Sequence, residues 1–360
     1  MRAQGRLRPI LLAALLCAAA SAADADEPQV RSSAALPTLR IDPTGISVSG
    51  VSSGGYQAAQ LQVAYSATFS GAGVIAAGPY FCAGTGYAWN LWRALNVCSD
   101  ADDYVPFTGP PLLEPSLQAV QDFAAKGRID DPANLRRARV YLFSGRLDTT
   151  VPPPVVGVAT AFHQALAGDP RQVVFEARID AAHAMVTETF GKACDVSAPP
   201  YLVDCDFDLA GALLEHIYGP LQPKSPTTRE PIPFDQRPFV AAGRTAGMAD
   251  TGYVYVPERC AEGAVCRLHV ALHGCQQSAS QIGDIFYRHA GYNAWAEAND
   301  IVVLYPQTVP MTTSWFGATL PWPNPKACWD WWGYTGPDFA NKQGAQPQAI
   351  KAMIDAIATR

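Results

Sequence analysis

The sequence predicts an α/β fold, in which a mostly parallel sheet carries helices on both faces. From Gly45 onward, short apolar runs alternate with longer amphipathic stretches. Runs that are apolar at every position are typical of strands buried on both faces, and strands that alternate with helices are typical of parallel sheets. The chain is long enough to bury one large core, so we expect a single domain over residues 23–360.

The first half of the chain carries four of the predicted strands. They are expected at residues 46–49, 73–77, 140–144 and 173–177. A helix over residues 55–65 follows the first strand, and a second helix, ATAFHQALA at 159–167, lies between the last two. Strand–helix–strand units of this kind indicate a parallel sheet.

The second half follows residues 219–238, which are rich in proline and polar residues and are expected to form a long surface connection. Three strands are expected at residues 252–256, 267–272 and 301–305, and two helices at 282–298 and 348–358. This half is too small for a core of its own, so we expect it to complete the same domain.

Residues 1–22 have the pattern of a secretory signal peptide. Three arginines precede an apolar run at residues 10–20, and the tripeptide Ala-Ser-Ala at 20–22 is a small-residue cleavage site. The run is short for a bilayer span, and no later run is long enough for a transmembrane helix. We therefore expect a protein secreted to the periplasm or outside the cell, without membrane contact.

The charge balance argues against a nucleic-acid partner. Cleavage would remove three of the 26 basic residues and none of the 32 acidic ones, leaving a net charge of −9. Nucleic-acid binding usually requires a basic face. We expect a monomer whose partner is its substrate.

Eight of the nine cysteines would remain after cleavage, and an even number in an exported chain predicts disulfides. Proximity along the chain favours the pairs Cys82–Cys98, Cys194–Cys205, Cys260–Cys266 and Cys275–Cys328. Eight cysteines allow 105 connectivities, so other pairings stay open. A metal site is less favoured, because no CxxC is present and no cysteine pair has a histidine at ligand spacing.

The most informative motif is Gly50-Val51-Ser52-Ser53-Gly54, which fits G-x-S-x-G between a predicted strand and a predicted helix. In that setting the serine occupies a sharp, strained turn that exposes its hydroxyl, so Ser52 is the candidate nucleophile. The alternative is a glycine- and serine-rich turn that fits by chance. Ser49 and Ser53 are competing nucleophiles, but only Ser52 has glycine two residues before and two residues after it.

A serine nucleophile needs a base, and the base needs an orienting carboxylate. Asp148 follows the strand at 140–144 and is the candidate acid; the alternative is a turn-capping aspartate before Pro152. His183 follows the strand at 173–177 and is the candidate base, in the Ser–acid–His order of hydrolase folds. The histidines within predicted helices or strands are expected to have packing or surface roles: His163, His216, His269 and His289.

The strand at 267–272 runs into His273-Gly274-Cys275, and an H-G segment after such a strand usually supplies the second oxyanion amide. The amides of Cys275 and Ser53 would then form the oxyanion hole. In ordinary hydrolases this segment precedes the nucleophile, whereas here it follows by more than two hundred residues. The sequence therefore predicts a circularly permuted α/β-hydrolase, with His273 as an alternative general base.

Four segments together resemble the extracellular poly(3-hydroxybutyrate) depolymerases that have a circularly permuted catalytic domain: SVSGVSSGGYQAAQLQVAYS, SGRLDTTVPP, LHGCQQS and CWDWWGY. The resemblance covers nearly the whole chain after residue 22. It implies the triad Ser52, Asp148 and His183 and an oxyanion hole of the Ser53 and Cys275 amides. It also implies that Trp331 lines a substrate subsite, and His273 and Lys326 are further candidate substrate-binding residues.

The expected reaction is hydrolysis of poly(3-hydroxybutyrate) or related short-chain polyesters through an acyl-enzyme, with no metal and no organic cofactor. A feruloyl or acetyl-xylan esterase on the same fold is the alternative, because fold does not determine substrate. Many members of the family carry a separate polymer-binding domain. This chain ends soon after its tryptophan cluster, so we expect it to adsorb polymer through its own apolar surface or to prefer amorphous polymer and oligomers.

Overall fold

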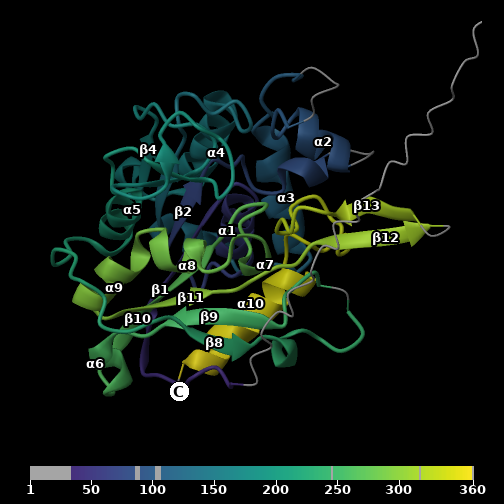
Figure 1. The fold of residues 1–360 in the computed structure, drawn as a ribbon. Coiled ribbons are helices and arrows are strands. Elements are labelled where there is room, and N and C mark those ends of the chain that lie inside the picture. Colours follow the sequence, from purple (N-terminus) through teal and green to yellow (C-terminus); the bar gives the residue numbers. More distant parts are fainter. Residues whose placement is uncertain (1–33, 86–89, 102–106, 245, 316–317, 359–360) are drawn as a thin grey trace, which may run out of the picture. The chain divides into compact units, whose positions relative to one another are not determined.

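The computed structural model is built around an eight-stranded sheet in the order β4-β3-β2-β1-β10-β11-β9-β8 (Figure 1). The strands are β4 (Val173–Glu176), β3 (Arg139–Phe143), β2 (Gly71–Ile75), β1 (Ile41–Val51), β10 (Cys266–Leu272), β11 (Ile301–Tyr305), β9 (Thr251–Tyr255) and β8 (Ile232–Asp235). The first six are parallel, and β9 and β8 run antiparallel at one edge. The structure describes residues 34–85, 90–101, 107–244, 246–315 and 318–358, and these described residues form one compact unit. The proposed signal peptide at 1–22 lies outside the described residues.

The helices and the smaller sheets connect these strands. The helices are α1 (Ser53–Ala64), α2 (Asn90–Asn96), α3 (Glu114–Ala125), α4 (Pro153–Leu166), α5 (Leu209–Tyr218), α6 (Glu258–Ala261), α7 (Ala279–Ile282), α8 (Ile285–His289), α9 (Tyr292–Asn299) and α10 (Ala345–Ile357). Short strands β5 (Met185–Thr187), β7 (Leu202–Asp204) and β6 (Lys192–Ala193) form a second sheet, and β12 (Met311–Trp315) and β13 (Ala318–Asn324) form a hairpin.

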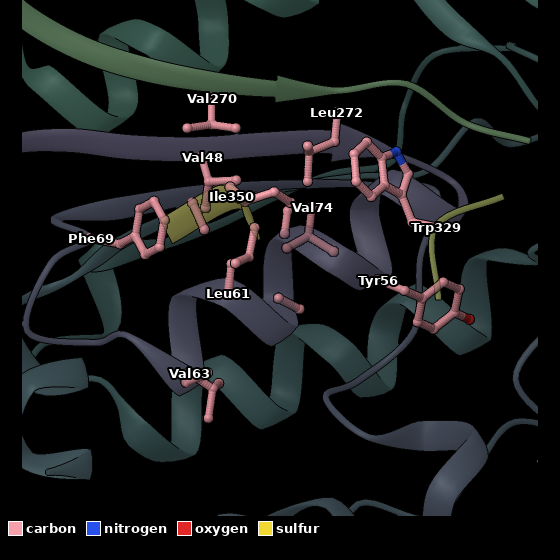
Figure 2. Close-up of a cluster of buried hydrophobic side chains, with 14 of the residues drawn as sticks. Val48, Tyr56, Leu61, Val63, Phe69, Val74, Val270, Leu272, Trp329 and Ile350 are labelled. Atoms are coloured by element: carbon pink, nitrogen blue, oxygen red, sulfur yellow. The ribbon is translucent and has the colours of Figure 1, made fainter. Parts of the chain in front are cut away.

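Both faces of the large sheet are buried, because alternate residues of each strand enter different cores. On one face, Val48, Val74 and Val270 pack with side chains of α1, α4 and α10. Figure 2 shows these three valines in one cluster with Leu61 of α1 and Ile350 of α10. On the other face the strands pack with α5, α8 and α9. The predicted α/β class, with helices on both faces, is therefore confirmed.

The sheet order also agrees with the predicted permutation. The nucleophile strand β1 lies between β2, which follows it in sequence, and β10, which comes more than two hundred residues later. Residues 251–305 thus supply the part of the sheet that precedes the nucleophile in an ordinary hydrolase. Parallel pairing aligns Gly50 with Leu272, so the carboxyl ends of β1 and β10 lie side by side.

One expectation about the second half is wrong. The single helix at 282–298 is divided into α7, α8 and α9, because Gly283 and Gly291 adopt φ values of 64° and 93°, which interrupt helical hydrogen bonding. The expected surface connection at 219–238 also contains a short edge strand, β8, which was not predicted from the sequence. Pro233 is tolerated within β8 because an edge strand can lack an amide donor on its outer side.

The four disulfides join the pairs that proximity favours: Cys82–Cys98, Cys194–Cys205, Cys260–Cys266 and Cys275–Cys328. Three of them close loops of 16 residues or fewer, and Cys275–Cys328 spans 53 residues. This last disulfide joins the segment after β10 to the segment after β13.

Candidate active site

Ser52 lies in a strained turn between the end of β1 and the start of α1. Its backbone φ is 55° and its ψ is −122°, a conformation that a residue with a side chain rarely adopts. The turn is held from both sides: the Ser52 amide donates to Ile75 O at 2.9 Å, and the Tyr56 amide donates to Ser52 O at 3.0 Å. This is the geometry of a nucleophile elbow.

The two glycines of the motif are required by close backbone contacts. A Cβ on Gly50 would lie 2.3 Å from the carbonyl group of Gly54. A Cβ on Gly54 would lie 2.4 Å from His273 O and 2.5 Å from Leu272 O. Side chains at either position would therefore push β1, α1 and β10 apart, which explains the G-x-S-x-G pattern physically.

The structure brings Ser52, His183 and Asp148 into one hydrogen-bonded chain. His183 Nε2 lies 2.9 Å from Ser52 Oγ, and His183 Nδ1 lies 2.8 Å from Asp148 Oδ2. An ionised carboxylate only accepts hydrogen bonds, so Nδ1–H donates to Asp148 and Nε2 can accept the serine proton. The other oxygen of Asp148 accepts from the amides of Thr150 and Val151 at 2.9 and 2.8 Å, which fixes the carboxylate.

The side chains of Ser52, His183 and Asp148 differ in their exposure to solvent, and the difference fits their roles. The Asp148 side chain is 1% exposed and that of His183 is 11% exposed, whereas Ser52 is partly exposed and lines a cleft of about 440 Å³. The carboxylate is thus shielded from water and the hydroxyl faces the cleft, as nucleophilic catalysis requires.

The loop after β10 lies directly against Ser52. A Cβ on Gly274 would be 3.3 Å from Ser52 Cβ. Gln277 holds this loop in place: its Oε1 accepts from the Gly274 amide at 2.7 Å, and its Nε2 donates to Tyr201 O at 2.9 Å. Within the described part of the chain no hydrogen bond uses the Cys275 amide, and Cys275 lines the cleft.

The Ser53 amide lies in the first turn of α1, where helical N–H groups have no partner within the helix. The N-terminal end of a helix also favours negative charge. The two amides of the expected oxyanion hole therefore come from the start of α1 and from the loop after β10, and both segments lie beside Ser52.

The tryptophan cluster divides between core and cleft. Trp329 is fully buried, whereas Trp331 and Trp332 line the cleft and keep 8% and 9% exposure. Trp331 stacks on Tyr56, with ring centroids 3.9 Å apart and planes 6° apart. Sequence reasoning missed Tyr56, whose position one helical turn after Ser52 was the available signal.

The buried carboxylate of Asp330 holds the loop at residues 333–335 through hydrogen bonds. One carboxylate oxygen accepts from the Gly333 and Tyr334 amides at 2.6 and 3.0 Å, and the other accepts from the amide and hydroxyl of Thr335 at 2.8 and 2.6 Å. Burial raises the pKa of Asp330 above its usual value, and these hydrogen bonds oppose that shift. Sequence reasoning did not single out Asp330.

The expectation that His273 contacts substrate is wrong. Its side chain is fully buried and does not line the cleft. Nδ1 lies 2.7 Å from Gly274 O, and Nε2 lies 3.3 Å from the amide and the hydroxyl of Thr308. Burial lowers the pKa of His273 to about 4. His273 directly follows β10 and is buried, whereas Cys275, two residues later, reaches the cleft. A buried imidazole outside the cleft is also unsuited to act as the base. Lys326, by contrast, does line the cleft.

A second serine–histidine contact is buried within the sheet. Ser47 Oγ and Ser49 Oγ each lie 2.7 Å from a different ring nitrogen of His269. All three side chains are fully buried, and burial lowers the pKa of His269 to about 3. Both nitrogens are occupied by hydroxyls, which bond onward to Tyr218 and Tyr292. This cluster is a packing network without access to substrate.

Two further features of the described residues concern metal binding and membrane spanning. Cys260, Cys266 and Asp300 lie close enough together to resemble metal ligands, but the two cysteines form a disulfide and supply no thiolate. No helix in the described ranges is both long and apolar enough to cross a membrane.

The fold and the site define a serine hydrolase of the α/β-hydrolase class. The chain is 38% identical over 333 residues to the polyhydroxybutyrate depolymerase of Talaromyces funiculosus, covering 90% of this chain and 92% of that protein. The chain belongs to the polyhydroxybutyrate depolymerase family. No protein-family model matches it.

Other comparisons agree. The chain is 41% identical over 330 residues to the poly(3-hydroxybutyrate) depolymerase of Delftia acidovorans, but it spans only 62% of the length of that relative. Two solved structures, each 36% identical with a TM-score of 0.78, cover 90% of this chain and are themselves 98% covered. One is a polyhydroxybutyrate depolymerase from Penicillium funiculosum, and the other is a serine-to-alanine variant of such an enzyme in complex with an R3HB trimer.

Proposed function

We propose that this chain hydrolyses the ester bonds of poly(3-hydroxybutyrate) or of related short-chain polyhydroxyalkanoates. The observation that carries the proposal is the hydrogen-bonded chain Ser52–His183–Asp148, whose serine opens into a cleft walled by Trp331 and Tyr56. The family membership supports the polyester as substrate. The relatives described above are polyhydroxybutyrate depolymerases, so the feruloyl or acetyl-xylan esterase alternative is not favoured.

In the proposed first step, His183 Nε2 takes the proton of Ser52 as its oxygen attacks the ester carbonyl. Asp148 holds the imidazole in the required tautomer and stabilises the imidazolium that forms. The amides of Ser53 and Cys275 donate to the oxyanion as charge develops on it, and a single such donor is typically worth about 3 kcal/mol in the transition state.

The tetrahedral intermediate then collapses and the ester C–O bond breaks. His183 gives its proton to the leaving hydroxyl group, and the acyl part remains bound to Ser52. Water attacks the acyl-enzyme with His183 again as base, which releases the acid and restores the serine. Water is the only co-substrate that the proposed reaction needs.

The product pattern tests this proposal. Wild-type protein is expected to clear a suspension of amorphous poly(3-hydroxybutyrate) and to release 3-hydroxybutyrate and short oligomers, measured by liquid chromatography. Ser52→Ala should abolish clearing, and Ser280→Ala, an exposed serine outside the cleft, should not. Release of ferulate or acetate from xylan without clearing of the polyester would contradict the proposal.

We further infer that residues 1–22 are a signal peptide and that residues 23–360 function outside the cytoplasm as one catalytic domain. Four disulfides support an oxidising compartment. N-terminal sequencing of protein recovered from the medium or periplasm tests the inference. A start near residue 23 is expected, and retention of the first 22 residues in the exported protein would contradict it.

A further inference from the structure

Lys326 is the one lysine in the described lining of the cleft, which contains no arginine, aspartate or glutamate. The rest of that lining is apolar or uncharged, with residues such as Leu91, Leu95 and Trp331. Two buried aspartates of this region have functions within the protein: Asp148 holds His183, and Asp330 accepts hydrogen bonds from its own loop. A lone cation in a largely apolar cleft of an acidic protein favours an anionic group on the ligand.

The backbone of Lys326 is held beside the proposed oxyanion hole. Lys326 O accepts from the Gln276 amide at 2.7 Å. Asn324 bridges the loop by accepting from the Cys328 amide at 3.0 Å and donating to Cys328 O at 2.8 Å. The Cys275–Cys328 disulfide joins the same two segments. The backbone of Lys326 is therefore held in a fixed position close to Cys275.

The Lys326 side chain is also available to a ligand. Lys326 is exposed and forms no ion pair with the described residues. Lys224, Lys342 and Lys351, in contrast, each pair with a carboxylate of the protein. An exposed, unpaired ammonium group keeps its three donors for an incoming anion.

The chemistry of the substrate identifies that anion. A polyhydroxyalkanoate chain is uncharged along its length, and its one ionised group at neutral pH is the terminal carboxylate. When an internal ester is cleaved, the acyl part that stays on the serine carries the hydroxyl end of the chain. The carboxylate end departs with the leaving alcohol. A cation in the cleft can therefore contact substrate charge only on the leaving side.

We propose that Lys326 binds the terminal carboxylate of short hydroxyalkanoate chains, on the side of the leaving group. The inference rests on the proposed function. It specifies the preferred soluble substrate as an oligomer with a free carboxyl end, cleaved close to that end. A 3-hydroxy acid product carries the same carboxylate and competes for the same position.

The test compares the trimer of (R)-3-hydroxybutyrate as free acid and as methyl ester, counting cleavage of internal esters only by chromatography. The wild type is expected to have a roughly three- to tenfold higher kcat/KM for the free acid, the range of one partly exposed charge-assisted contact. The difference should lie mainly in KM and should shrink in about 0.5 M salt, which is roughly three times the physiological ionic strength of about 0.15 M.

Three variants assign the preference to the side chain. Lys326→Met should lose the preference for the free acid, so that its kcat/KM becomes equal for the two substrates, and Lys326→Arg should keep the preference. Lys126→Met, which removes an exposed lysine that follows α3 outside the cleft, should behave as the wild type.

Equal kcat/KM for the two substrates in the wild type, or an unchanged preference in Lys326→Met, would overturn the inference and leave the depolymerase proposal intact. The proposed function fails separately, if neither form of the trimer nor the amorphous polymer is hydrolysed.

Discussion

The ring of Trp331 stacks on the ring of Tyr56, which lies on α1 one turn after Ser52. The Tyr56 amide donates to Ser52 O, and its hydroxyl donates to Cys98 O. Burial raises the pKa of the Tyr56 hydroxyl far above its usual value, so the hydroxyl stays protonated and can donate at neutral pH. One side chain thus connects the nucleophile turn, a disulfide-bonded loop and the aromatic wall of the cleft.

We predict that Tyr56→Leu raises KM for the trimer about two- to tenfold, because an aromatic pair contributes about 0.5–1.5 kcal/mol beyond its buried area. Tyr56→Phe keeps the ring and should change KM by less than twofold, given about 1 kcal/mol or less for a neutral hydrogen bond. Steady-state kinetics on the trimer and on p-nitrophenyl butyrate check this. An equal loss on the small ester would assign Tyr56 to the elbow instead.

Gln277 is predicted to position the loop that presents the Cys275 amide. Gln277→Ala removes the acceptor of the Gly274 amide and both donors to the Pro200–Tyr201 segment. We expect kcat to fall roughly ten- to a hundredfold with little change in KM, less than the 10²–10³ typical for loss of an oxyanion donor itself. Gln281→Ala, outside the cleft lining, is the control. A rise in KM at constant kcat would show that Gln277 contacts substrate and does not position the loop.

The Cys275–Cys328 disulfide is predicted to matter more than its counterpart Cys260–Cys266. In the chain-entropy model, the 53-residue separation corresponds to about 4 kcal/mol and the 6-residue separation to about 2 kcal/mol. Replacing both cysteines by alanine in each pair, followed by urea denaturation and kinetics, compares them. Only the first double variant should lose activity in the folded protein, and equal activities would refute a role for that disulfide in shaping the cleft.

Three buried histidines predict a loss of stability in acid. Burial lowers the pKa of His163 and His273 to about 4 and that of His269 to about 3, against about 6.5 in an unfolded chain. Between these values the unfolded chain binds more protons, so stability is fully present above pH 6.5 and declines as the pH falls toward 4.

His163 offers the cleanest variant for this prediction. Its Nε2 has no hydrogen-bond partner among the described residues, so His163→Leu removes a buried titrating group at little cost in hydrogen bonding. Melting temperatures measured from pH 7 to pH 4 should fall less steeply in the variant than in the wild type. Parallel curves would show that the buried imidazole does not couple folding to pH.

The sequence predicted the parts of this molecule that depend on local pattern. Continuous apolar runs predicted the six parallel strands, and glycines on both sides of Ser52 predicted a turn that the Gly54–His273 contact explains. The order of motifs predicted the circular permutation. The structure brings Ser52, Asp148 and His183 within hydrogen-bond distance, as their positions after strand ends suggested.

What the sequence did not predict depends on contacts between distant segments. Gln277 joins residues 274 and 201, and Trp331 meets Tyr56 from 275 positions away. No local pattern marks either pair. The same limitation explains the error at His273: a histidine at a strand end can face the cleft or the core, and only packing against Trp329 and Thr308 directs it inward.

Labelling with a fluorophosphonate, followed by peptide mass spectrometry, tests the central role of Ser52 most directly. We predict a single adduct on the peptide containing residues 50–54, assigned to Ser52 by fragmentation and absent from Ser52→Ala. An adduct on Ser53 or Ser49, or labelling of Ser52→Ala at the wild-type rate, would contradict the assignment of Ser52 as the nucleophile.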